Sequence, residues 1–139
     1  MTAPSSGRRW WELIGEQAAG PGAPMRPQVV TWEVSKALPD GAILIGDAGT
    51  VTVRGGRLRP RKGTRYSFSG TPRTMGSALP CAIGARTAHP GRPVIARAGD
   101  GSMSRGTGEP VTLARYDPPV EVVARMSSEN RFPTLRAGR

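Results

Sequence analysis

Short apolar runs separated by glycines and prolines make up most of the chain from residue 27 to residue 125. The runs 42–45, 93–98 and 120–124 predict strands, and the first is continuous enough for a strand that is buried on both faces. Residues 66–68 suit a further, short strand. Between the strands we expect helices, over residues 27–38, where apolar residues recur at spacings of three and four, 75–88 and 106–116.

This alternation of strands and helices predicts an α/β fold with a doubly wound, mostly parallel sheet and helices on both faces. In such sheets, ligands bind beyond the carboxyl ends of the strands. Two of the predicted strands run into a loop that contains aspartate and glycine, over residues 46–50 and 99–102. We therefore expect a binding site formed by these two loops.

Both ends of the chain are predicted to lie outside this domain. Residues 1–25 are expected to be a disordered tail and linker with a possible short helix over 10–19, and the domain covers 26–125. Residues 126–139 show no clear period, which predicts an irregular tail and a fold that is incomplete at its C-terminus. Residues 51–65 carry several arginines among glycines and predict a surface segment.

Length, charge and cysteine content limit the possible functions. The 139 residues suffice for one domain with a core. The net charge of +10 comes mostly from arginine, which pairs well with phosphate, although coding bias explains it equally well because Ala, Gly and Pro are inflated too. Cys81 is the single cysteine, which fits a reducing cytoplasm, and we expect it to be buried. No apolar stretch approaches the roughly 20 residues that a membrane span needs.

The loop Gly99-Asp100-Gly101-Ser102 is the main candidate for chemistry. Its glycines let backbone amides approach a ligand closely, and successive amides form a cradle for an anion. A carboxylate in this cradle repels phosphate unless a cation lies between them, and Mg²⁺ takes one or two carboxylates together with phosphate oxygens. The loop therefore predicts a metal-bridged diphosphate site, whereas Gly-Asp-Gly taken alone is more often a plain turn.

The surrounding residues make the prediction more specific. In order and spacing, residues 26–125 resemble the C-terminal domain of thiamine-diphosphate enzymes of the acetolactate synthase, pyruvate oxidase and quinone-dependent pyruvate dehydrogenase group. The matching motifs include Leu38-Pro39-Asp40, Asp47-Ala48-Gly49-Thr50, Thr74-Met75-Gly76, Leu79-Pro80 and Gly99-Asp100-Gly101. The resemblance implies that Asp100 ligates Mg²⁺ and that Met75 supports the bent cofactor. It also implies contacts to the diphosphate from two loops, at Gly49 and Thr50 and at Gly99, Gly101 and Ser102.

The chain departs from this family in four ways, one of which is Arg73 in place of a small residue in the loop before Met75. The family's second Mg²⁺ ligand is an asparagine whose position falls on Met126-Ser127, so the nearest candidate is Asn130, three residues later. Pro110 stands where the family has a leucine inside a helix, which costs about 3 kcal/mol if the helix spans it. The family's activating glutamate belongs to another domain of a partner subunit, and no residue here is assigned that role.

These departures predict a fragment that binds thiamine diphosphate and Mg²⁺ but is inactive alone. A 2-oxo acid such as pyruvate is expected as a substrate only in the complete enzyme, which would be a homo-oligomer or contain a partner domain. Two alternatives stay open. One is a basic module that binds nucleic acid through Arg54 to Arg65, although this segment lacks interleaved aromatic residues. The other is a non-functional remnant of the family.

Overall fold

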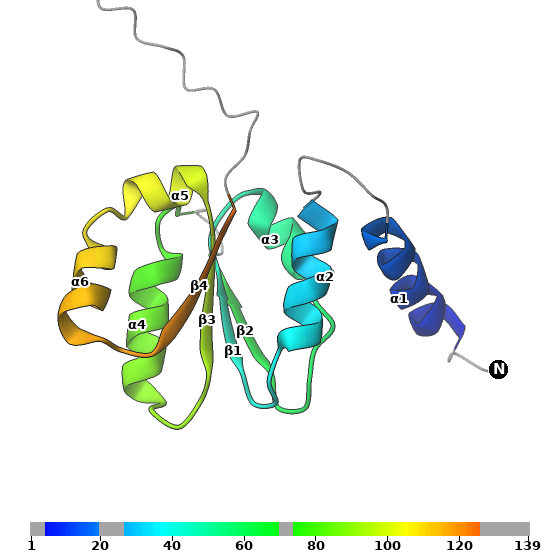
Figure 1. Cartoon of the computed structure of the whole chain (residues 1–139), viewed down its shortest axis with the longest axis horizontal. Helices are drawn as coiled ribbons and strands as arrows, with labels where there is room; N and C mark the ends of the chain where they lie inside the picture. Colours follow the sequence, from blue (N-terminus) through cyan, green and yellow to red (C-terminus); the bar gives the residue numbers. More distant parts are fainter. Residues whose placement is uncertain (1–4, 20–26, 70–73, 126–139) are drawn as a thin grey trace, which may run out of the picture.

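The computed structural model describes residues 5–19, 27–69 and 74–125. In this part of the chain, a four-stranded sheet has the strand order β2-β1-β3-β4 (Figure 1). All three strand pairs are parallel. The strands are β1 (Ile43–Gly46), β2 (Arg65–Phe68), β3 (Val94–Gly99) and β4 (Val120–Arg125). The four predicted strands are thus found within one or two residues of their expected bounds.

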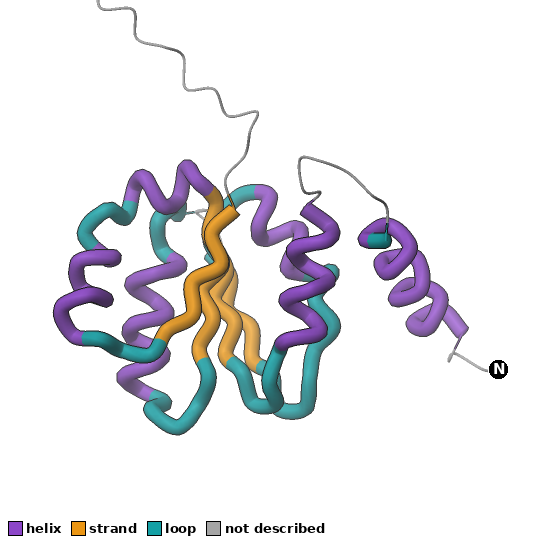
Figure 2. The backbone as a smooth tube through the Cα atoms, viewed as in Figure 1, coloured by secondary structure: helices purple, strands orange, loops and turns teal. Residues whose placement is uncertain are grey.

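Helices lie on both sides of the sheet, with α2 and α3 on one side and α4 and α6 on the other (Figure 2). Their bounds are α2 (Pro27–Ala37), α3 (Thr50–Gly55), α4 (Ala78–Ala88), α5 (Asp100–Arg105) and α6 (Glu109–Tyr116). The predicted doubly wound α/β fold is therefore confirmed. Helix α1 (Ser5–Ala18) packs on the outer side of α2, away from the sheet (Figure 1).

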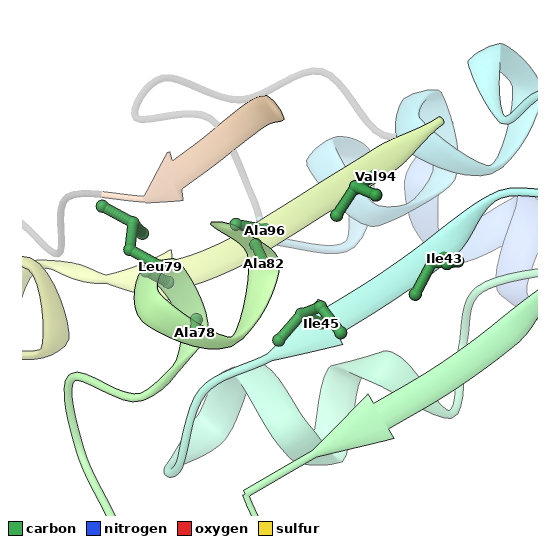
Figure 3. Close-up of a cluster of buried hydrophobic side chains, with 8 residues drawn as sticks. Ile43, Ile45, Ala78, Leu79, Ala82, Val94 and Ala96 are labelled. Atoms are coloured by element: carbon green, nitrogen blue, oxygen red, sulfur yellow. The ribbon is translucent and has the colours of Figure 1, made fainter. Parts of the chain in front are cut away.

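Alternate side chains of the central strands fill two separate cores, because successive residues of a strand point to opposite faces. Toward α4, one core is made by strand residues that pack on Ala78, Leu79 and Ala82 (Figure 3). Toward α2, the other core contains Leu44 and Ile95 with residues of the connecting segments. Burial of both faces explains why β1 is a continuous apolar run and why β3 is apolar except for Arg97.

Helix α1 begins at Ser5, so the expected disordered tail up to residue 9 is too long. Arg8 and Arg9 are good helix formers. Ile14 and Ala18 fix the helix in place, because their side chains are buried, with only 3% and 9% of each residue exposed. The predicted irregular tail over residues 126–139 lies outside the described residues, as does the predicted linker at 20–24.

Three local expectations are wrong for identifiable reasons. Helix α6 begins at Glu109, so Pro110 occupies its first turn, where no hydrogen bond is lost and the expected cost does not arise. The segment 51–65 is not only surface, because it starts within α3 and carries Leu58, which is 3% exposed in the core. Cys81 is exposed, since its position on α4 points away from the apolar face of that helix.

Candidate functional site

The two Asp-plus-Gly loops lie next to each other at the carboxyl edge of the sheet. Strands β1 and β3 are hydrogen-bonded neighbours in parallel register, with Gly46 opposite Arg97. The pairing extends one residue into the first loop, because the N–H of Asp47 donates to the carbonyl oxygen of Arg97 at 3.0 Å. The loops that follow begin α3 and α5, which lie at the same end of the molecule (Figure 1). The predicted meeting of the loops is confirmed.

Glycine has a different role in each loop. Gly49 has φ 103° and ψ −154°, a backbone conformation that only glycine adopts without strain. Gly99 has φ −96°, which suits any residue, and a Cβ atom there would meet nothing within 4 Å. The fold therefore does not require glycine at position 99. The missing side chain instead leaves open space above the loop, as a backbone cradle for a ligand needs.

Met75 reaches the second loop from the segment that precedes α4. Its side chain is 42% exposed, and a Cβ atom at Gly101 would lie 3.1 Å from the Cε atom of Met75. The next residue, Gly76, has φ 91° and turns the chain toward α4. The structure thus brings together three segments that the sequence places far apart.

Asp100 begins α5 and is half-buried, with its Oδ1 accepting a hydrogen bond from the N–H of Gly101 at 2.8 Å. Ser102 is buried, at 3% exposure. Among the described residues, no group of three or more His, Cys, Asp or Glu could bind a metal. One carboxylate fits Mg²⁺ when phosphate oxygens and water complete the octahedron. Asn130, the second predicted ligand, lies outside the described residues.

Two functional features of the site were not predicted from the sequence. The carboxylate of Asp47 is buried and accepts N–H groups of the Met75 segment. Arg97 is 4% exposed, its Nε and Nη1 atoms have no hydrogen-bond partner, and its Nη2 donates to Thr31 Oγ1 at 3.3 Å. Burial lowers the pKa of Arg97. The nearby Tyr66 acts to raise this pKa, and Arg54 acts to lower it further. In the sequence, the only sign of either contact is the charge itself, which directly follows a buried strand for Asp47 and lies within one for Arg97.

Some arginines of the segment 54–65 bind the chain itself. Arg57 Nη1 donates to Gln17 Oε1 of α1 at 3.3 Å, and Arg61 Nη2 donates to the carbonyl oxygen of Lys36 in α2 at 3.2 Å. Arginine N–H groups in this segment therefore connect it to neighbouring helices, a structural use that needs no nucleic acid.

Comparison with known proteins identifies the family. Residues 47–125 match the family model described as thiamine pyrophosphate enzyme, C-terminal TPP binding domain. The chain belongs to this family. Thiamine pyrophosphate is thiamine diphosphate, so the resemblance inferred from the sequence motifs is confirmed, and the nucleic-acid alternative is not favoured. The matched residues include both loops and Met75, and the chain is accordingly a thiamine-diphosphate-binding domain.

Similar proteins have related names. The YdaP protein of Bacillus subtilis, named as thiamine pyrophosphate-containing, is 34% identical over 88% of this chain and 21% of its own length. A sulfoacetaldehyde acetyltransferase of Castellaniella defragrans is 33% identical over 81% of this chain and 19% of its own. An acetolactate synthase of Arthrospira platensis is 36% identical over 70% of this chain and 17% of its own length. The chain spans about a fifth of the length of these relatives. In the described part, no helix is both long and apolar enough to cross a bilayer.

Proposed function

We propose that this domain binds the diphosphate end of thiamine diphosphate through Mg²⁺, with Asp100 as the metal ligand from the described residues. Backbone N–H groups of the loop 99–102 face the diphosphate, and Gly49 and Thr50 contact it from the loop that follows the neighbouring strand. Met75 supports the cofactor from the third segment. The observation that carries this proposal is the open space at Gly99, next to the carboxylate of Asp100 and followed by Gly101, over which Met75 lies.

The bound cofactor supplies a carbanion that adds to a carbonyl group and stabilises negative charge after bond cleavage. The residues of this chain bind and orient it. The carboxylate of Asp100 repels the diphosphate unless Mg²⁺ lies between them, so we expect cofactor and metal to bind together. Asn130 is the proposed second ligand, and its shifted position in the sequence predicts weak affinity.

We further propose that the whole protein acts on 2-oxo acids such as pyruvate, in a homo-oligomer or with a partner domain. The acetolactate synthase and benzoylformate decarboxylase among the relatives support this substrate class. The activating glutamate is expected from the partner, so the 139-residue chain should not decarboxylate pyruvate alone. The single cysteine supports a cytoplasmic location.

Thermal unfolding of the full chain tests the proposed cofactor site. Thiamine diphosphate should raise the melting temperature only with Mg²⁺, since a ligand at 100 times its Kd adds about 2.7 kcal/mol to the native state. Asp100→Ala should abolish the rise. The combined change Arg57→Ala, Arg59→Ala and Arg61→Ala should keep it, measured against the variant's own melting temperature without ligand. A rise that survives Asp100→Ala, or needs no Mg²⁺, would contradict the proposal.

A further inference from the structure

Asp47 occupies a fixed position at the end of β1. It is 1% exposed, and its N–H donates to the carbonyl oxygen of Arg97 in β3 at 3.0 Å. Its own carbonyl oxygen accepts a hydrogen bond from the hydroxyl of Thr52 in α3. The backbone of Asp47 is therefore held by the sheet and by α3, and this determines where its carboxylate lies.

The carboxylate of Asp47 accepts hydrogen bonds from three backbone N–H groups. Oδ1 accepts from Ala48 at 2.7 Å and from Gly76 at 3.0 Å. Oδ2 accepts from Gly76 at 3.0 Å and from Ala78 at 3.2 Å. An ionised acceptor makes such bonds stronger than neutral ones. Since Gly76 and Ala78 lie 29 and 31 residues along the chain, Asp47 joins the β1 loop directly to the Met75 segment.

The Met75 segment is held on its other side by Ser69, whose Oγ accepts from the N–H of Thr74 at 2.8 Å and donates to the carbonyl oxygen of Thr74 at 3.1 Å. Asp47 holds it at the start of α4. Ser77 precedes α4 but makes no side-chain cap bond, because its hydroxyl donates to the carbonyl oxygen of Thr74. The first N–H group of α4 is instead satisfied by Asp47, which replaces a local cap. Gly76 passes close to α5, where a Cβ atom on it would lie 3.3 Å from Cβ of Arg105. Met75, directly before Gly76, is thereby held over Gly101.

We propose that Asp47 is a positioning residue that holds Met75 against Gly101 and so shapes the cofactor site. The proposal rests on the proposed function. Asp47 acts through the backbone of Gly76 and Ala78, and both of its carboxylate oxygens face N–H groups, so it does not contact the cofactor itself. Its part in the site differs from that of Asp100, which is proposed to bind the metal.

The variant Asp47→Asn tests this with almost no change in volume. Its side-chain NH₂ group would face the N–H donors of Gly76 or Ala78, so the link should break while the cores remain. Methyl NMR of the full chain, with ¹³C-labelled methionine, should show an NOE from the Met75 methyl to Gly101 in the unmodified protein. We expect Asp47→Asn to lose this NOE and keep the resonance of Met103, which packs against the core on the α4 side of the sheet.

Cofactor affinity gives the second readout. With Mg²⁺ present, Asp47→Asn should weaken thiamine diphosphate binding at least tenfold by isothermal titration calorimetry. Asp40→Asn makes the same change at an exposed turn and should stay within twofold of the unmodified chain. An Asp47→Asn variant that keeps the NOE, or loses it but binds the cofactor within twofold, would overturn the proposal.

The NMR readout needs no ligand, which separates this proposal from the proposed function. If the unmodified chain does not bind thiamine diphosphate, the proposed function fails and the NOE alone decides whether Asp47 positions Met75. If Asp47→Asn unfolds, the spectra are recorded in trimethylamine N-oxide, which favours the compact state. A variant that stays unfolded there would show that Asp47 is needed for the whole fold, which also overturns a positioning role.

Discussion

The Cε atom of Met75 lies over Gly101, so close that a Cβ atom on this glycine would be 3.1 Å away. The two residues come from different segments, one before α4 and one inside α5. In the proposed cofactor site, this contact would set the width at this point. It also makes position 101 one where stability and binding are expected to change in opposite directions.

Gly101→Ala should therefore stabilise the chain and weaken the site. Alanine inside α5 gains up to about 1 kcal/mol over glycine, because the unfolded chain loses less entropy. The flexible end of Met75 moves aside to admit the new methyl group, which displaces it from its place in the site. Urea unfolding should show the gain in stability, and the thermal shift produced by thiamine diphosphate with Mg²⁺ should shrink.

Gly84→Ala provides the matched control for this change. Gly84 lies inside α4, and a Cβ atom there would meet nothing within 4 Å. Gly84→Ala should raise the free energy of unfolding by a similar amount, about 0.5–1 kcal/mol, and leave the thermal shift produced by the cofactor unchanged. An equal cofactor response in both variants would show that Met75 and Gly101 do not shape the site.

Gly99→Ala and Gly49→Ala should differ in their effect on folding. Gly99→Ala should change the free energy of unfolding by less than about 0.5 kcal/mol, since its φ is ordinary and the space around it is open. Gly49→Ala should cost about 1–3 kcal/mol because of its positive φ. Both methyl groups would enter space that the protein leaves open, where we propose that the diphosphate binds, so both variants should weaken cofactor binding at least tenfold. If Gly99→Ala binds normally by calorimetry, that loop does not approach the diphosphate.

Arg97→Met should stabilise the chain. Two nitrogen atoms of the buried guanidinium have no partner, and burial already lowers its pKa. Replacing such a charge with an apolar side chain of similar length removes the desolvation cost, which is about 1–4 kcal/mol in comparable cases. Urea unfolding measures the change. As a control, Arg59→Met at an exposed position should change the free energy of unfolding by no more than about 0.5 kcal/mol. Destabilisation by Arg97→Met beyond that of the control would mean that the guanidinium is satisfied in solution.

The sheet could be predicted because its central strands are apolar, apart from Arg97 in β3, and lie between glycine and proline breaks. The short helices α3 and α5 were not predicted as elements, since six residues rich in glycine and polar side chains carry no readable period. Leu58 was missed for a related reason, because a single apolar residue among arginines gives no pattern.

The site was predictable only in part. Parallel strands that each end in an Asp-plus-Gly loop bring those loops together, so the proximity of Gly49 and Gly99 followed from the pattern. The link from Asp47 to Gly76 did not, because backbone donors have no residue signature and the partners lie 29 residues apart. The face of β3 on which Arg97 lies likewise depends on how α2 packs, which the local sequence does not specify.

Electron paramagnetic resonance of Mn²⁺, used in place of Mg²⁺, tests the central claim most directly. The full chain should bind Mn²⁺ when thiamine diphosphate is present, with one ion per chain, and show little binding without it. Asp100→Ala should release the ion to solution, whereas Asp40→Ala, at an exposed turn, should not. Mn²⁺ binding that persists in Asp100→Ala, or that does not depend on thiamine diphosphate, would contradict a metal-bridged diphosphate site at Asp100.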